Sequence, residues 1–159
     1  MEDRNSILIS ELKKLLRGGG AHVGLKDAVA DLSFNSLGEK PHNLPYSIWQ
    51  LTEHIRIAQW DMLEFSKNGD HKSPRWPEQY WPEESAPEDE KMWKTTLKQI
   101  DDDLQEFLSL LDNEDLYIEI LHGNGQSILR EALQIADHNA YHVAEIVVMR
   151  RLLGNWKPQ

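Results

Sequence analysis

The chain has 159 residues, a formal net charge of −10 and a pI near 5.1, a length typical of one domain with its own core. The negative charge and the lack of a Lys/Arg-rich block disfavour nucleic acid and an anionic membrane surface as partners. The absence of cysteine excludes disulfides, thiolate metal sites and a cysteine nucleophile. We therefore expect a single domain over residues 1–159.

No targeting segment stands out. The first residues include acidic ones where a secretion signal would be basic, and no apolar run approaches the roughly eighteen residues of a membrane span. We expect a cytoplasmic protein with no membrane partner.

Helical periodicity dominates the first half of the chain. Residues 4–17 predict a helix ended by the glycines at 18–20, and residues 25–32 predict a short helical piece. Further on, Ser47 is a candidate cap, and apolar residues recur every three or four positions over 48–65. This stripe predicts the second long helix.

The second half of the chain begins with a proline-rich segment. Residues 68–87 contain four prolines, which fix too many φ angles for a long helix, so we expect a long loop. Its aromatic residues are Trp76, Tyr80 and Trp81. A third long helix is predicted over 88–111 and a last one over 127–153, ended by Gly154. The last helix is apolar nearly all round, so we expect it to be the most buried.

Four long amphipathic helices without strands predict an all-α fold. The simplest arrangement is a four-helix bundle of the up-down type, with the long aromatic loop between the second and third long helices. A loop of this length is unusual in such a bundle unless it packs against or gates something.

Three histidines are candidates for a metal site. His138 and His142 lie one turn apart on the last helix, a spacing of about 6 Å that lets both rings reach one ion. A third ligand must come from elsewhere, and His54 on the second long helix is the candidate. Three imidazoles with one open position would make a catalytic site. The alternative stays open that the pair is incidental and His54 is an ordinary interior residue.

Other polar residues are weaker candidates. Solvated histidines are ordinary in loops and at helix ends, which is where these four lie: His22, His42, His71 and His122. Asp61 is about 10 Å along the helix from His54, too far to share its metal. Glu145 follows His142 by one turn, so it is a candidate for a supporting hydrogen bond or a proton-transfer role, or it is a surface carboxylate.

Two segments carry a family resemblance. Residues 41–65 and 129–154 resemble the two signature regions of the DinB/YfiT-like superfamily, and YWPEESAP at 80–87 also resembles its members. The resemblance implies a four-helix bundle in which His54, His138 and His142 hold a divalent metal. Zinc or nickel is most frequent among relatives, and iron remains a candidate because imidazole also suits it.

The resemblance leaves the reaction open, because relatives include thiol S-transferases, thiol-dependent isomerases, metal-dependent hydrolases and proteins with no known reaction. We expect a metalloenzyme whose metal activates water or a thiol for a small-molecule substrate, with a low-molecular-weight thiol as one candidate. The aromatic loop would close its pocket, or else form a surface patch. The alternative is a metal-stabilised binding or stress-response protein without turnover. Family resemblance and six tryptophans also suggest a homodimer.

Overall fold

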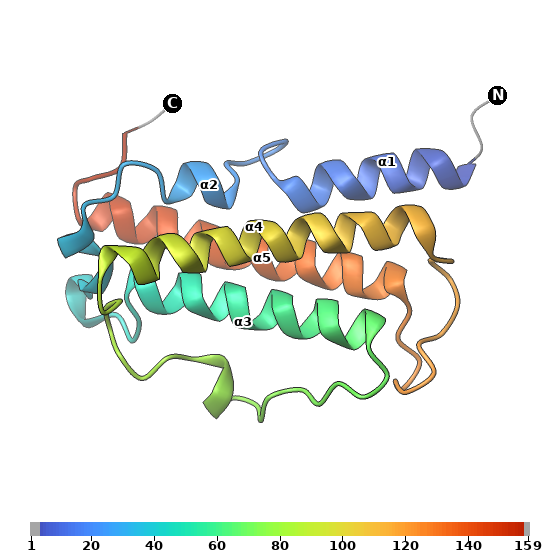
Figure 1. Cartoon of the computed structure of the whole chain (residues 1–159). Coiled ribbons are helices and arrows are strands. Elements are labelled where there is room, and N and C mark those ends of the chain that lie inside the picture. Colours follow the sequence, from blue (N-terminus) through green and yellow to red (C-terminus); the bar gives the residue numbers. More distant parts are fainter. Residues whose placement is uncertain (1–3, 158–159) are drawn as a thin grey trace.

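The computed structural model describes residues 4–157, which form an all-helical protein (Figure 1). Its long helices are α1 (Arg4–Arg17), α3 (Ile48–Lys67), α4 (Glu90–Asn113) and α5 (Ile128–Leu152), with a short α2 (Leu25–Ala28). Three 3₁₀ turns complete the secondary structure: η1 (Phe34–Gly38), η2 (Pro41–Asn43) and η3 (Glu78–Tyr80). Over the described range, β pairing is limited to an isolated bridge between Glu119 and Ser127.

Local capping explains where the helices begin and end. The Ser47 hydroxyl accepts a hydrogen bond from the Gln50 amide while the Gln50 side chain accepts one from the Ser47 amide, which satisfies two free N–H groups of α3. The side chains of Asp89 and Ser127 accept hydrogen bonds from the third backbone amide of α4 and of α5 and so cap these helices. Gly154 follows α5 with φ of +70°, a conformation that favours glycine. The predicted boundaries of the four long helices are thus confirmed to within about two residues, whereas α2 is shorter than predicted.

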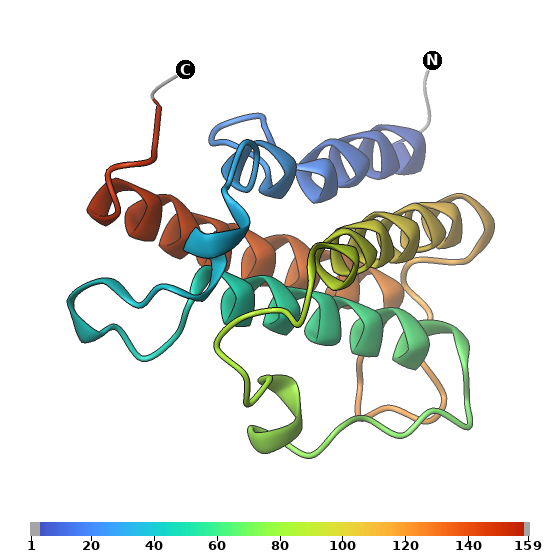
Figure 2. The same cartoon turned by 60° about the vertical axis from the view of Figure 1, so that its left-hand side comes forward.

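The four long helices contact one another in a ring. Helix α3 packs against α4 and α5, and α1 packs against the same two helices from the other side (Figures 1 and 2). Helices α3 and α4 run in the same direction, because side-chain contacts between them advance together along both. These contacts pair Glu53 with Thr96, Gln59 with Ile100 and Lys67 with Glu106.

This parallel pair corrects the expected up-down topology, in which successive helices alternate in direction. A short turn cannot join two parallel helices, so residues 68–89 must return from the end of α3 to its beginning. Helix α3 has 20 residues and is therefore about 30 Å long. We call residues 68–89 the crossover segment. The prolines predicted that it is a loop, but nothing in them specified its path.

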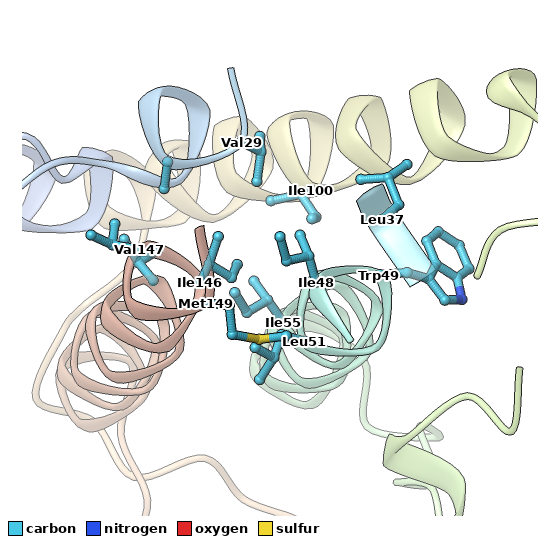
Figure 3. Packing of buried hydrophobic residues seen from close by; sticks show 12 residues of the cluster. Val29, Leu37, Ile48, Trp49, Leu51, Ile55, Ile100, Ile146, Val147 and Met149 are labelled. Carbon is cyan, nitrogen blue, oxygen red and sulfur yellow. The ribbon is translucent and has the colours of Figure 1, made fainter. Parts of the chain in front are cut away.

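Two apolar clusters fill the interior. One joins the first half of α3 to the second half of α5 below α2, and Figure 3 shows Ile48, Ile55 and Ile146 meeting there. The other joins α1, the end of α4 and the first half of α5. Helix α5 contributes residues 128–136 to one cluster and 143–149 to the other, so His138 and His142 lie where the two meet.

Helix α5 is less buried than predicted. Its outer face exposes four large apolar side chains, because the ring of helices covers only its inner side: Leu133, Tyr141, Val148 and Leu152. We call these four residues the α5 stripe. The more buried helix is α3, with 11 of its 20 residues buried against 11 of 25 in α5. Among the described helices, none combines the length and apolar character needed to span a membrane.

Candidate metal centre

His54, His138 and His142 come together between α3 and α5. Their ring centroids lie 4.6 to 4.9 Å apart, and the Nε2 atoms of His54 and His138 are separated by 3.0 Å. His54 and His142 are buried, at 2% and 8% exposure, and His138 is half-buried. Each of the three can offer one ring nitrogen within 4.8 Å of the other two, and over residues 4–157 no other group of His, Cys, Asp or Glu does so.

Hydrogen bonds at Nδ1 orient two of the rings. His54 Nδ1 lies 2.9 Å from the carbonyl oxygen of Tyr80, and His142 Nδ1 lies 2.6 Å from a carboxylate oxygen of Glu145. Both oxygens can only accept, so both Nδ1 atoms carry the hydrogen and both Nε2 atoms keep a free lone pair. This is the arrangement found when histidine binds a metal through Nε2. Glu145 therefore makes the hydrogen bond to His142 that was one of the roles considered for it from the sequence.

The donor set fits a divalent metal ion. Imidazole binds zinc at about 2.0–2.1 Å, so two nitrogens on one ion lie at most about 4.2 Å apart. The 3.0 Å between the Nε2 atoms of His54 and His138 is within this limit. The lone pair on His54 Nε2 faces His138 Nε2, and a cation bound by both nitrogens would satisfy it.

Burial keeps the three rings neutral near pH 7. Burial, together with the neighbouring His138 and His142, lowers the pKa of His54 from 6.5 to about 4, and the hydrogen bond to the Tyr80 carbonyl opposes this shift. Burial and His138 together lower the pKa of His142 to about 4. Burial also lowers the pKa of His138. Only a neutral ring nitrogen can bind a metal, so the fold holds all three rings in the ligating form.

The crossover segment lies against His54 and His142. Trp81 stacks on the ring of His54, with centroids 3.9 Å apart and planes 5° apart, and its ring also lies 4.9 Å from Tyr46 and 6.0 Å from His142. Tyr141 meets His142 edge-on at 5.0 Å. Trp76 lies 6.4 Å from His54 but is 69% exposed. Aromatic groups thus border the histidines on the side of the crossover segment.

Asp61 anchors this cover. Its carboxylate accepts a hydrogen bond of 2.6 Å from the Tyr80 hydroxyl and lies 2.7 Å from His71 Nε2. Asp61 lies outside the histidine group, as its distance along α3 predicted. The sequence reasoning missed this role and treated His71 as a solvated loop residue. His54 and Asp61 are seven residues apart and therefore lie on one face of α3. This spacing could have indicated that Asp61 faces the same loop as His54.

The remaining loop histidines lie outside the group. His22 is exposed and contacts the Val23 carbonyl oxygen, His42 is exposed in η2, and His122 Nε2 lies 2.8 Å from the Phe65 carbonyl oxygen. A carbonyl oxygen can only accept, so His122 Nε2 is the donor. None of the three is in reach of the candidate centre.

Fold and site together define an all-helical protein that gathers three neutral histidines from two antiparallel helices. The family model of the DinB superfamily matches residues 24–146, a range that contains all three histidines, and the chain belongs to this superfamily. The superfamily is associated with metal ions, in agreement with the histidine group. No curated protein and no solved structure matches the chain.

Proposed function

We propose that the protein is a metal-dependent enzyme acting on a small molecule, with His54, His138 and His142 as ligands of one divalent ion. The observation that carries the proposal is the pair of Nε2 atoms 3.0 Å apart, each ring placed by a hydrogen bond at its other nitrogen. Zinc and nickel are the leading ions and iron(II) the next, because imidazole suits all three. The four long helices would form the four-helix bundle implied by the resemblance.

In this proposal some residues orient the ligand histidines and others exclude water from them. The carbonyl of Tyr80 and the carboxylate of Glu145 hold His54 and His142, while Trp81 keeps water from one face of His54. A metal with an open position would act as a Lewis acid that lowers the pKa of bound water or of a bound thiol. The small-molecule substrate would reach it past Trp76, the exposed aromatic of the crossover segment.

The runner-up is a metal-stabilised binding or stress-response protein without turnover. The observation in its favour is burial, since His54 is only 2% exposed beneath Trp81. In that case the ion would tie α3 to α5 and offer no position for a substrate.

Metal loading is the first test. Protein purified without chelator, then reloaded with Zn²⁺, Ni²⁺ or Fe²⁺ and desalted, is expected to retain about one ion per chain by elemental analysis. His54→Ala, His138→Ala and His142→Ala should each reduce retention, whereas His22→Ala, at an exposed histidine, should not. Absence of any retained ion in the wild type, or an equal loss in His22→Ala, would show that the ligand assignment is wrong.

Cobalt substitution separates the candidate activities. An added low-molecular-weight thiol, such as cysteine, that binds Co²⁺ gives a thiolate charge-transfer band, which supports thiol transfer. Hydrolysis of 4-nitrophenyl acetate that depends on the metal and on His142 supports water activation. A cobalt protein that shows neither, and whose spectrum is unchanged by cyanide or thiol, would have a closed site and would favour the runner-up.

We also propose a homodimer formed through the α5 stripe. The expectation from sequence relied on family resemblance and on the six tryptophans. Only Trp76 of the six is exposed, so the structural support comes instead from the stripe. The four side chains lie on one face of α5, and exposed apolar residues gathered on one face commonly mark an interface. Sedimentation equilibrium at micromolar concentration should give a dimer for the wild type and a monomer for Val148→Glu. A wild-type monomer would exclude the proposal.

A further inference from the structure

A chain of side-chain hydrogen bonds connects the backbone of α4 to His138. Gln59 on α3, 1% exposed, donates from Nε2 to the carbonyl oxygen of Ile100 at 2.7 Å. Asn139 on α5 donates from Nδ2 to Gln59 Oε1 at 2.9 Å. Asn139 Oδ1 in turn lies 3.3 Å from His138 Nδ1. The chain therefore links α4, α3 and α5 and ends at one of the three histidines.

The carbonyl of Ile100 on α4 determines which group is the donor in each hydrogen bond of this series. The Ile100 carbonyl can only accept, so Gln59 must turn its NH₂ group toward it and its oxygen toward Asn139. Asn139 must then turn its NH₂ group toward Gln59, which leaves its oxygen facing His138. A hydrogen must therefore be on Nδ1 of His138, and the lone pair is on Nε2, the atom that faces His54.

The tautomer of His138 depends on this series of hydrogen bonds, whereas the tautomers of His54 and His142 are set by their direct partners. The rings of His54 and His142 contact oxygens that can only accept, a carbonyl and a carboxylate. An amide such as Asn139 can present either its oxygen or its nitrogen, and therefore cannot by itself select a tautomer. Gln59 selects the tautomer of His138, because its oxygen accepts from the Asn139 NH₂ group and so turns the Asn139 oxygen toward His138.

We propose that Gln59 and Asn139 are positioning residues that hold His138 in the Nδ1–H tautomer, with its Nε2 lone pair directed at the shared metal position. The proposal rests on the proposed metal function, but neither residue contacts the ion. A purely structural role for the chain would require the hydrogen bonds between helices and would not require this tautomer.

The test reads the tautomer of His138 in metal-free, ¹⁵N-labelled protein by long-range ¹H–¹⁵N correlation of the imidazole rings. The wild type is expected to show the Nδ1–H form at neutral pH. Gln59→Leu frees the Asn139 amide to rotate, so it should give a mixture of tautomers and at least about tenfold weaker zinc binding in a chelator competition. Gln59→Met, which keeps the side-chain length, is the second variant should the leucine protein fail to fold.

A conservative change provides the rescue. Aspartate at 139 can only accept from His138, so Gln59→Leu combined with Asn139→Asp should recover the Nδ1–H tautomer and much of the zinc affinity. Thr96→Val is the matched control, because the buried Thr96 hydroxyl also joins α4 to α3, through Glu53, but leads to no histidine. It should lower stability and leave the tautomer and the zinc affinity unchanged.

The proposal is overturned if wild-type His138 carries its hydrogen on Nε2. It is also overturned if Gln59→Leu and Gln59→Met keep both the tautomer and the affinity, or if Thr96→Val changes them equally. Failure of the wild type to bind zinc would instead contradict the proposed function, and the tautomer of the metal-free protein would still decide the present inference.

Discussion

Glu145 occupies the position from which a single carboxylate can set both the orientation and the basicity of His142. Its Oε2 atom accepts a 2.6 Å hydrogen bond from His142 Nδ1, and burial raises the pKa of the carboxyl group. Removing such a partner typically weakens metal binding by about 10- to 100-fold. We therefore expect Glu145→Ala to weaken zinc binding by about tenfold or more, measured by chelator competition, and Glu145→Gln to weaken it less because an acceptor oxygen remains.

The control for this prediction is Glu114→Ala, which removes an exposed negative charge at the end of α4. It should leave zinc binding unchanged. An equal effect in Glu114→Ala would mean that net charge, and not the bond to His142, governs affinity.

At the residue scale, the sequence could predict which histidines meet but only in part what holds them. The four-residue spacing of His138 and His142 follows from helix geometry alone, and His54 on the second long helix is the candidate third ligand, a choice that the family resemblance supports. The partners Tyr80, Asn139 and Gln59 could not be predicted, because their contacts depend on how three helices and a loop pack. His71 was misread for the same reason, since nothing in the loop sequence indicates that it reaches Asp61.

The crossover segment is attached to α3 at several levels. Ser47 donates to the Ser85 carbonyl and Gln50 to the Pro82 carbonyl, while Tyr80 contacts both His54 and Asp61. Burial and the hydrogen bond to Asp61 raise the pKa of the Tyr80 phenol, so it remains a donor. The segment therefore acts as a strap held along one face of the helix.

Loss of one attachment should loosen this strap. Tyr80→Phe removes the hydrogen bond to the buried Asp61 carboxylate, and bonds to charged groups contribute about 1.5–3 kcal/mol. We expect a loss of about that size in the free energy of unfolding, measured in urea. Trypsin should also cleave faster after Lys72 and Arg75, two exposed residues of the segment.

Tyr117→Phe is the matched control, because Tyr117 is 62% exposed and removal of its hydroxyl should change neither stability nor cleavage. Wild-type cleavage rates in Tyr80→Phe would contradict the anchoring role of Asp61.

At the element scale, the helices were predictable because their signals are local. Caps such as Ser47 and terminators such as Gly154 act within a few residues of themselves. The direction of α4 relative to α3 was not predictable, since it depends on buried contacts between residues distant in sequence, such as Gln59 with Ile100. The same applies to the exposure of α5, whose apolar outer face cannot be distinguished from its inner face by composition alone.

The whole molecule should lose stability in mild acid. The pKa values of His54 and His142 fall to about 4 on folding, below the 6.5 of an unperturbed histidine. Between these two values the unfolded chain binds protons that the folded protein does not, so the free energy of unfolding should decrease as pH falls from about 6.5 to 4. Urea titrations of metal-free protein across this range measure the slope.

A bound metal should extend the range of stability. Protons compete with the metal only for ring nitrogens of the folded protein, whose pKa values are low, so the stabilisation by zinc should persist below pH 6.5 and be lost as pH falls through about 4. His142→Ala should have a smaller pH slope when metal-free, because one titrating group is gone. A slope equal to that of the wild type, or zinc stabilisation that already vanishes near pH 6.5, would contradict the burial of these rings.

The ring order α1, α4, α3, α5 has a consequence for how the chain folds. Two pairs of long helices follow each other along the chain and run antiparallel, α1 with α3 and α4 with α5, but neither pair is among the main helix contacts. The protein therefore lacks the local helical hairpins that let small helical proteins fold fast. Helix α3 instead meets α4 across the crossover segment and α5 across a larger part of the chain. Closing such long loops costs entropy before any contact compensates for it. We therefore expect refolding from urea, followed by stopped-flow tryptophan fluorescence, to be slower than the microsecond-to-millisecond range of helical bundles with local contacts.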